Sequence, residues 1–218
     1  MSGVNRARDP RSRGAPPAEQ RLGRDAVLAR AEELIDRDGV AGFSLRSLAR
    51  DLDVQPAALY NHVAGRDELL DAVTTRFIES FELPEIGDLG WAAWIRSVAV
   101  GLRRGLTERP SMGELFIARA PDVAAGPLYQ ARVFAKLEAA GMRRADAHLA
   151  WHVVYTVVVG TAAQQRVRGP DPAETFALVL DVALSGLATE VEHGTSPRSR
   201  ALHEAHQHTH AALAPHEG

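Results

Sequence analysis

Residues 39–63 read GVAGFSLRSLARDLDVQPAALYNHV, and this stretch decides the fold. Its leucines repeat at helical spacing after Ser44, and serine is among the residues that cap helix N-termini best. Pro56 favours the start of a further helix, because the amide hydrogen that proline lacks has no intrahelical partner at the first position. The stretch therefore predicts two short helices, over 45–52 and 56–62, joined by a tight turn.

A longer amphipathic helix is expected on each side of this pair. Apolar residues from Val27 to Ile35 recur every three or four positions, as on one face of a helix that Gly39 ends. Asp67 is expected to cap the following helix, whose apolar residues continue to Phe81, just before Pro84. The arrangement matches the helix-turn-helix plan, in which the second short helix enters a DNA major groove. A plain helical hairpin in the core is the alternative, because a fold does not establish a function.

The rest of the chain predicts more helices and no strands. Glycine and proline separate five further helical segments, which cover residues 91–108, 112–118, 123–140, 145–165 and 172–192. No run alternates polar and apolar residues over the length of a strand. The fold class is therefore expected to be all-α.

Composition excludes several classes of protein. With 45% hydrophobic and 24% charged residues, the chain is typical of a folded protein. The absence of cysteine excludes disulfides, thiolate zinc sites and cysteine nucleophiles. The longest apolar run, over residues 153–163, is far short of the roughly 20 residues of a membrane-spanning helix. Since no secretory signal is visible either, a cytoplasmic protein without membrane contact is expected.

Charge is distributed unevenly along the chain, although the net charge is only −3. Residues 1–66 hold 11 arginines against 9 acidic residues, whereas the remainder carries a net charge of −5. The basic N-terminal part is the side expected to contact a polyanion such as DNA.

The helix-turn-helix stretch resembles the TetR family of bacterial transcription regulators. The segments GVAGFSLRSLA (39–49), VQPAALYNHV (54–63) and LLDA (69–72) look like the family's DNA-binding domain almost position by position, most nearly in the subfamily of the tetracycline repressor. Asp53 stands where the family usually has glycine, and Arg66 where it usually has lysine. Both are compatible with the pattern, because aspartate tolerates left-handed backbone angles and arginine keeps the positive charge.

The resemblance implies a repressor that binds double-stranded operator DNA as a homodimer and is released by a small-molecule effector. Residues 22–66 would form the helix-turn-helix domain, and 67–194 the ligand-binding and dimerisation domain, whose last two helices pair with their copies. Two-fold symmetry then predicts a near-palindromic operator. Composition marks residues 1–21 as a flexible basic arm and 195–218 as a disordered, histidine-rich tail.

By resemblance, the residues that face DNA lie on the two short helices and just after them. Arg46 would read a guanine edge or clamp a phosphate, whereas Tyr60 and His62 would hold phosphates. The full expected set is Arg46, Gln55, Pro56, Ala57, Ala58, Tyr60, Asn61, His62 and Arg66.

A ligand can release DNA only if it binds one arrangement of the protein better than another, so a cavity is expected among the later helices. Its candidate lining consists of large apolar side chains and a few polar ones. These are Phe77, Phe81, Trp94, Met112, Phe116, Arg119, Phe134, Trp151, His152, Tyr155 and Gln164. At helical spacing, each of these residues is also compatible with plain core packing.

The drug-binding positions of the tetracycline repressor indicate which chemical class of effector to expect. Aligned approximately, those positions read Glu82, Val98, Phe116, Arg119 and Gln164 here. Phe116 and Gln164 replace the histidine and glutamate that contact magnesium, and phenylalanine offers magnesium no oxygen ligand. An apolar or aromatic effector is therefore expected rather than tetracycline, oriented by Arg119, His152 or Gln164. A surface ion pair is the alternative role of Arg119.

Other functions find less support in the sequence. His148 and His152 have a spacing that can hold a metal, but no third ligand accompanies them, so helix packing is preferred and no metal or cofactor is expected. The histidines of the tail lack any framework that would organise them. No nucleophile, acid–base pair or cofactor loop has a recognisable spacing, which argues against an enzyme. A DNA-binding protein without an effector is the remaining alternative.

Overall fold

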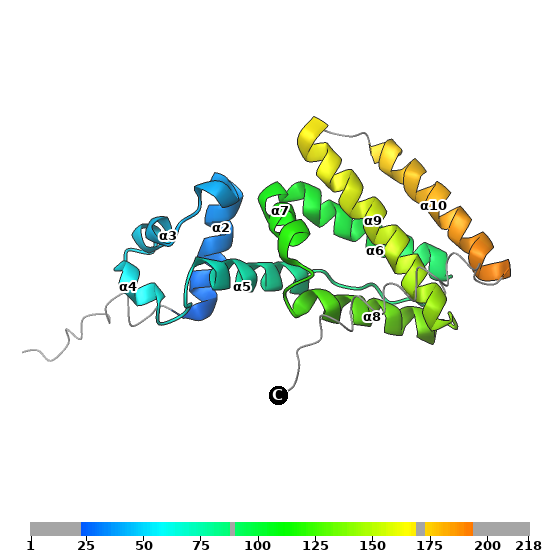
Figure 1. The fold of residues 1–218 in the computed structure, drawn as a ribbon, viewed down its shortest axis with the longest axis horizontal. Helices are drawn as coiled ribbons and strands as arrows, with labels where there is room; N and C mark the ends of the chain where they lie inside the picture. The colour runs from blue at the N-terminus through cyan, green and yellow to red at the C-terminus, as the bar shows by residue number, and fades with distance from the viewer. Residues whose placement is uncertain (1–22, 88–89, 169–172, 194–218) are drawn as a thin grey trace, which may run out of the picture.

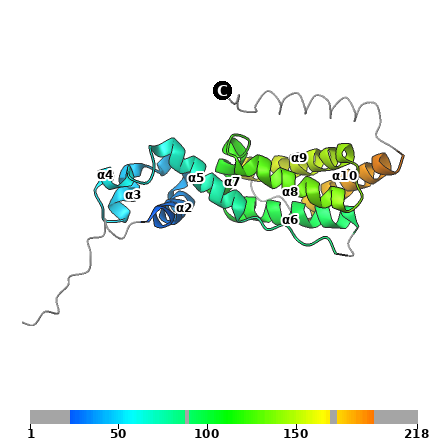
Figure 2. The ribbon, with the colours of Figure 1, turned by 90° about the horizontal axis from the view of Figure 1, so that it is seen from below.

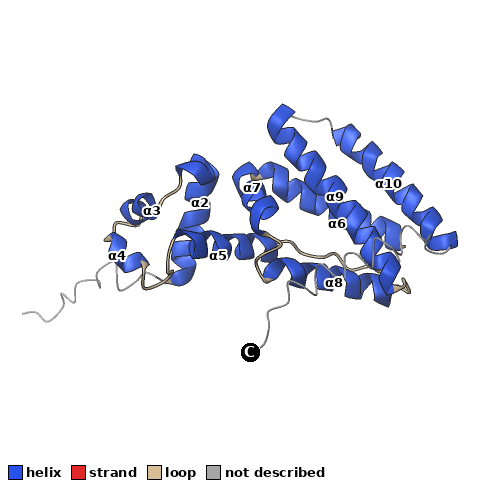
Figure 3. Ribbon diagram, in the orientation of Figure 1, coloured by secondary structure: helices blue, strands red, loops and turns tan. Residues whose placement is uncertain are grey.

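The computed structural model describes residues 23–87, 90–168 and 173–193, and within these ranges all regular secondary structure is helical (Figure 3). The helices are α2 (Arg24–Gly42), α3 (Leu45–Asp51), α4 (Pro56–Leu59), α5 (Arg66–Glu79), α6 (Trp91–Glu108), α7 (Pro110–Arg119), α8 (Ala125–Ala139), α9 (Arg144–Arg168) and α10 (Ala173–His193). The all-α expectation is confirmed for this part of the chain. The expected basic arm and histidine-rich tail lie outside the described residues.

The helices form two groups that α5 joins. Helices α2, α3 and α4 lie together at one end of the molecule, and α6 to α10 form a larger bundle at the other (Figures 1 and 2). Helix α5 packs against α2 in the first group and against α7 and α8 in the second. Helix α7 also packs against α2, so that two helices connect the groups. None of the described helices is both long and apolar enough to cross a bilayer.

Local sequence signals shape the first group largely as expected. Gly39, which was expected to end the first helix, has a non-helical backbone with φ of 77°, but it only kinks α2, which continues to Gly42. The hydroxyl of Ser44 accepts the amide of Ser47 at 3.1 Å, and the Ser47 hydroxyl accepts the amide of Ser44 at 3.1 Å, which completes a capping box at α3. Asp53 adopts φ of 53°, the left-handed conformation that the turn between α3 and α4 requires.

Three other expected helix boundaries are wrong. Helix α4 ends at Leu59 rather than at residue 62, because the chain tightens into a turn in which the amide of His62 donates to the carbonyl of Leu59 at 2.9 Å. Asp67 is not the cap of α5, since Gly65 occupies that position and Asp67 lies in the first turn. The same helix ends at Glu79, so Phe81 lies beyond it.

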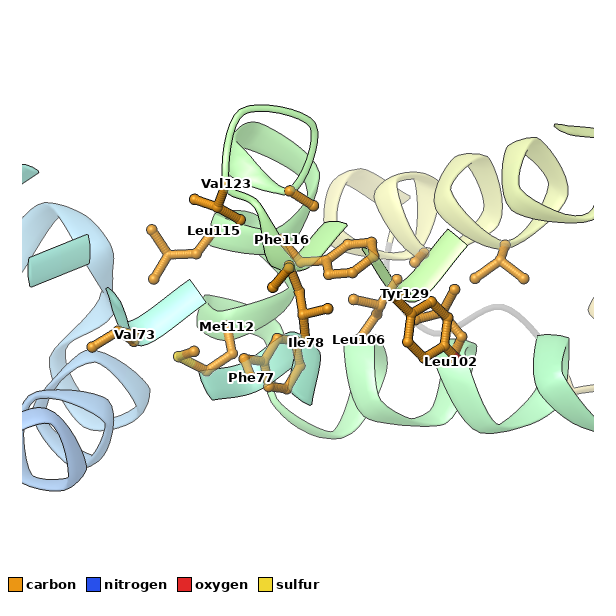
Figure 4. Packing of buried hydrophobic residues seen from close by; sticks show 14 of the residues in the cluster. Val73, Phe77, Ile78, Leu102, Leu106, Met112, Leu115, Phe116, Val123 and Tyr129 are labelled. Carbon is orange, nitrogen blue, oxygen red and sulfur yellow. The ribbon is translucent and has the colours of Figure 1, made fainter. Parts of the chain in front are cut away.

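One apolar core runs through both groups. Trp94 is fully buried on α6, and its indole nitrogen donates to the carbonyl of Pro84 at 2.9 Å. Where α5, α6 and α7 meet, Phe77, Met112 and Phe116 pack among aliphatic side chains (Figure 4). The DNA-binding candidates and the larger bundle are therefore connected by packed side chains rather than by a flexible linker.

Candidate DNA-binding surface and ligand cavity

Helices α3 and α4 form a compact unit with one buried side. Leu48, Leu59 and Val63 are at most 2% exposed and face the core of the first group. The tight turn is closed by backbone hydrogen bonds, including one of 3.0 Å from the amide of Val54 to the carbonyl of Ala49. Because the buried side fixes the unit, its outer side is held in a defined orientation toward solvent.

The nine expected DNA-contact residues all retain access to solvent. Seven are exposed, namely Arg46, Gln55, Pro56, Ala57, Tyr60, Asn61 and Arg66, and two are half-buried, namely Ala58 and His62. Tyr60 is 59% exposed although it follows the fully buried Leu59, and a large aromatic side chain in that position is available to a partner.

Some arginines near this surface form ion pairs with carboxylates, and others do not. Arg30 forms ion pairs with Glu33 and Asp51, and Arg37 pairs with Asp38 at 2.7 Å. In the described part of the chain, by contrast, no carboxylate forms an ion pair with Arg46, whose guanidinium is free to meet an anion. The exposed Arg46 on the outer side of α3 thus offers a positive charge that no carboxylate of the described residues neutralises.

Arg66 has a structural task besides the expected phosphate contact. Its guanidinium donates to the carbonyl of Val40 at 2.8 Å and to that of Phe43 at 3.4 Å, which ties the start of α5 to the segment before α3. Arg24 likewise donates to the carbonyl of His62 and pairs with Glu68. A guanidinium carries five N–H donors, so Arg66 keeps donors for a phosphate.

A cavity of about 200 Å³ lies among α5, α7, α8 and α9 in the larger bundle. It is lined by Ile78, Phe116, Ala120, Pro121, Gly126, Pro127, Tyr129, Gln130, Trp151, His152 and Tyr155. The aromatic rings contact one another, with centroids of Trp151 and Tyr155 5.5 Å apart and those of Tyr129 and Trp151 6.0 Å apart. The lining includes no lysine, arginine, aspartate or glutamate.

Burial strengthens the preference of the two cavity tyrosines for the neutral form. Loss of hydration raises the pKa of Tyr129 to about 12 and also raises the pKa of Tyr155 above its usual value. Both phenols are therefore neutral hydrogen-bonding groups at physiological pH. Together with Gln130 and His152 they give an otherwise apolar cavity a few polar groups that can orient a ligand.

Four of the eleven expected lining residues meet at this cavity, namely Phe116, Trp151, His152 and Tyr155. The other apolar candidates are used in packing: Trp94 and Met112 are fully buried, and Phe77 and Phe81 pack edge-on at 4.9 Å. Phe134 stacks on His148 at 3.9 Å. That ring contact gives His148 a packing role, and the described residues hold no cluster of three metal-ligating side chains.

The polar candidates Arg119 and Gln164 do not line the cavity either. Gln164 is exposed on α9, and Arg119 forms ion pairs with Asp71 at 2.5 Å and Asp67 at 2.9 Å. Sequence reasoning missed Tyr129 and Gln130. Tyr129 could have been found, because it lies four residues after Ala125 and four before Val133 on the buried side of α8.

A second hollow of about 470 Å³ lies between α5 and α8. Its walls include Glu79, Arg132 and Leu128, and the Leu128 side chain is 64% exposed. These exposed side chains make it a groove on the surface, so the smaller aromatic cavity is the better candidate for a ligand that must be enclosed.

The outer face of α10 carries exposed apolar residues. Leu178 and Val182, one helical turn apart, are 65% and 66% exposed, and Val179 beside them is 40% exposed. Helix α10 packs on α9 through its opposite side, where Phe176, Leu180 and other residues are buried. The exposed face is thus available to a partner.

Comparisons with known proteins agree with this architecture. Residues 27–73 match the family model of bacterial regulatory proteins, tetR family. An HTH-type transcriptional regulator of Saccharopolyspora erythraea is 35% identical over 158 residues, which cover 71% of this chain and 66% of the relative. The chain spans about two thirds of the length of this relative, and half or less of several other curated relatives that it matches.

Solved structures with the same fold hold DNA or small molecules. BioQ with its double-stranded DNA operator is 29% identical, with a TM-score of 0.65, and the match covers 77% of this chain and 99% of BioQ. ActR of Streptomyces coelicolor in complex with (S)-DNPA is 25% identical, with a TM-score of 0.68, and the match covers 77% of this chain and 98% of ActR.

Proposed function

Because this chain belongs to the tetR family of bacterial regulatory proteins, we propose that it regulates transcription by binding operator DNA and releasing it when a small molecule fills its cavity. As a repressor it would bind as a homodimer to a near-palindromic operator, with one half-site for each chain. The observation that carries the proposal is the outer side of α3 and α4. There Arg46 and Tyr60 are exposed on a unit whose opposite side is buried in the core.

The DNA contacts follow from the chemistry of that surface. The Arg46 guanidinium can bind a guanine edge with two hydrogen bonds or clamp a phosphate. Tyr60 and His62 are placed to hold phosphates and set the register. Ala57 and Ala58 offer methyl contacts, so sequence discrimination would depend chiefly on Arg46, Gln55 and Asn61. The operator complex of BioQ, which shares the fold, supports DNA binding by this chain.

The effector would be a neutral, planar aromatic molecule. The rings of Phe116, Trp151 and Tyr155 favour stacking with aromatic groups, and the lining offers no charged partner for an ionic ligand. The phenol of Tyr129, His152 and Gln130 would orient its polar groups. Since cavities of roughly 150 Å³ bind benzene, a cavity of about 200 Å³ suits a ligand of one or two rings, before any adjustment of the walls. The complex of ActR with (S)-DNPA, a structure with the same fold, supports a small-molecule effector.

The homodimer would form through the exposed face of α10. Leu178 and Val182 leave apolar surface that a symmetric copy can cover, and small residues such as Gly160 on α9 and Gly186 on α10 allow close helix approach. Leu178→Asp combined with Val182→Asp should convert the protein to a monomer in sedimentation experiments. Leu128→Asp, a change at an equally exposed leucine on α8, should leave the dimer intact.

Selection of bound duplexes from a random DNA pool tests the function directly. We expect the purified protein to enrich one near-palindromic sequence, and the affinity to fall steeply with salt as phosphate-bound cations are released. A protein that enriches no sequence would refute the proposal.

A second experiment separates a ligand-responsive regulator from a DNA-binding protein without effector. Neutral one- and two-ring aromatic compounds would be screened for release of the selected duplex, with magnesium and tetracycline as the comparison expected to have no effect. Trp151→Ala should abolish the response of any active compound while leaving DNA binding intact, because Trp151 lines the cavity from α9, a helix of the larger bundle, whereas α4 lies at the other end of the molecule (Figure 1). If no aromatic compound releases the duplex, the protein binds DNA without this control.

A further inference from the structure

The groove between α5 and α8 shares part of its wall with the aromatic cavity. Ile78 of α5 and Tyr129 of α8 line both hollows. Their side chains are buried, with 2% and 6% exposed, and both belong to the packed cluster shown in Figure 4. The cavity and the groove therefore adjoin at this pair of side chains, which we call the partition.

The Tyr129 side chain is held in the partition by contacts between rings. Its ring centroid lies 6.3 Å from that of Phe81 and 6.0 Å from that of Trp151. Within the described part of the chain, no residue forms a hydrogen bond with its phenol. Because packing alone fixes this ring, it can turn aside for a ligand group that packs against the same neighbours.

The groove presents apolar surface to solvent along α8. Leu128, Ala131 and Ala135 line it and are exposed, and their spacing of three and four residues places them on one face of the helix. The alanine side chains are short, which leaves room beside the helix. Exposed apolar surface rimmed by charged groups, here Glu79 and Arg132, is typical of a ligand-binding groove.

The shape and the walls of the groove favour an extended aliphatic occupant. Its lining on α8 runs from Ala125 to Ala135, and ten residues of helix span about 15 Å. Its volume of about 470 Å³ is more than twice the 200 Å³ of the cavity. Among its described lining residues only Tyr129 is aromatic, so the walls offer a ligand aliphatic contacts rather than stacking.

We propose that the effector is an aromatic molecule with an unbranched hydrocarbon chain, whose ring lies in the cavity and whose chain lies in the groove. The ring would stack on Trp151 and Tyr155, and the chain would pass between Ile78 and Tyr129 to cover the apolar face of α8. An uncharged chain suits this path, because the partition is buried and offers no partner to a charge. This inference rests on the proposed function of the cavity as the effector site.

Phenols with chains of increasing length test the proposal by direct binding. Phenol, 4-ethylphenol, 4-butylphenol and 4-hexylphenol share a ring that is neutral at pH 7, and they differ only in the chain. Calorimetric titration of the full chain measures their dissociation constants without DNA. Each methylene removed from water should strengthen binding by about fourfold, so 4-hexylphenol should bind about 15-fold more tightly than 4-butylphenol.

A carboxylate in the groove should remove the gain that the chain provides. Leu128→Asp introduces one beside the partition, and Ala135→Asp introduces one about two turns further along α8. Each should cut the 15-fold difference to less than about threefold, because a hydrocarbon chain cannot cover a carboxylate without desolvating it. Val100→Asp, at a half-exposed valine of α6 that lines neither hollow, is the matched control and should keep the full difference.

A change in the cavity should give the opposite pattern. Trp151→Ala removes a ring on which the phenols would stack, so it should weaken binding of phenol and of 4-hexylphenol by a similar factor. The groove variants, by contrast, should bind phenol within about twofold of the unmodified protein, since Leu128 and Ala135 do not line the cavity.

Each outcome bears on a different claim. If no phenol binds, or if Trp151→Ala binds them all as the unmodified protein does, the proposed effector site fails and the inference fails with it. If the phenols bind in the cavity but 4-butylphenol and 4-hexylphenol bind equally well, the groove holds no chain. A 15-fold difference that survives in both groove variants would also refute the proposal. So would a Leu128→Asp protein that sediments as a monomer while Val100→Asp remains a dimer, because the groove would then be an interface between copies.

Discussion

The DNA-binding unit of α3 and α4 and the ligand cavity differ in how far apart along the chain their contacts lie. The unit is held by neighbours in sequence, such as Ser44 with Ser47 and Val54 with Ala49. The cavity is assembled from four helices and the turn after α7, with lining residues from Ile78 to Tyr155. A surface built from local contacts can be identified from sequence, whereas a cavity emerges only when distant helices pack.

The two regions also differ in what their exposed and buried atoms offer a partner. The outer side of α3 and α4 presents the charged guanidinium of Arg46 and the exposed phenol of Tyr60 to solvent, which suits a polyanion. The cavity presents aromatic rings and neutral polar groups, which suits an uncharged aromatic molecule. Helices α5 and α7, which both pack against α2, connect these dissimilar surfaces.

Truncation of the buried anchor of the DNA-binding unit should have the largest effect. Leu59→Ala removes a fully buried side chain, so we expect a loss of about 2–5 kcal/mol in the free energy of unfolding. Leu128→Ala, the same change at an exposed leucine, should cost less than about 0.5 kcal/mol. Urea denaturation of both variants measures the difference, and equal losses would mean that Leu59 is not the anchor.

Replacement of the outer side chains should affect DNA and leave stability unchanged. Arg46→Ala and Tyr60→Ala should each weaken binding to the selected duplex by about 1–3 kcal/mol, because each removes contacts to bases or phosphates. Fluorescence anisotropy with a labelled duplex measures the affinity, with Arg104→Ala as the control for charge. Unchanged affinity in both variants would show that DNA binds elsewhere.

Loss of the helix cap should have a smaller effect that is confined to stability. Ser44→Ala removes the acceptor for the amide of Ser47 and should lower the free energy of unfolding by about 0.5–2 kcal/mol. The matched change Ser97→Ala, within α6, removes only a hydroxyl that donates to the carbonyl of Ala93. That variant should be at least as stable as the unmodified protein, because alanine has the higher helix propensity.

Titration of the cavity should give the most specific effect. Since burial raises the pKa of Tyr129 to about 12, the folded protein keeps a proton that the unfolded chain loses near its ordinary pKa of about 10. Stability should therefore be fully present below pH ~10 and fall as the pH rises toward ~12. Tyr129→Phe should reduce this dependence in denaturation experiments at successive pH values. If the stability of Tyr129→Phe depends on pH as that of the unmodified protein does, the Tyr129 phenol is exposed to water in the folded protein and its pKa is not raised by burial.

The sequence predicted the DNA-binding unit in detail because its signals are local. Ser44 as cap and the left-handed backbone of Asp53 are confirmed, whereas Gly39, which was expected to end the first helix, only kinks α2, and the helix continues to Gly42. The helix over residues 91–108 was also predicted with its observed bounds. The prediction that Asp67 caps α5 is wrong because the helix already begins at Arg66, and Asp67 lies in its first turn, where its carboxylate pairs with Arg119.

The cavity was predictable only in part. Helical spacing indicates which side of a helix is buried, but it does not distinguish a residue that fills the core from one that borders a void. Trp94 and Trp151 illustrate this limit: both were candidates, yet the first is fully packed on α6 and the second lines the cavity on α9. The contribution of Ala120 and Gly126 depends on the turn that joins α7 to α8, for which the sequence carries no spacing signal.

Site-directed cross-linking tests the central claim most directly, because the chain has no natural cysteine. A single cysteine at the exposed Asn61, carrying a photoactivatable group, would be irradiated in complex with the selected duplex. A cysteine at Val100, which is half-exposed on α6, serves as the control position. Cross-links from position 61 to bases in both half-sites, with none from position 100, are the predicted result. Equal cross-linking from both positions, or cross-links from position 100 alone, would contradict the assignment of α3 and α4 as the DNA-binding surface.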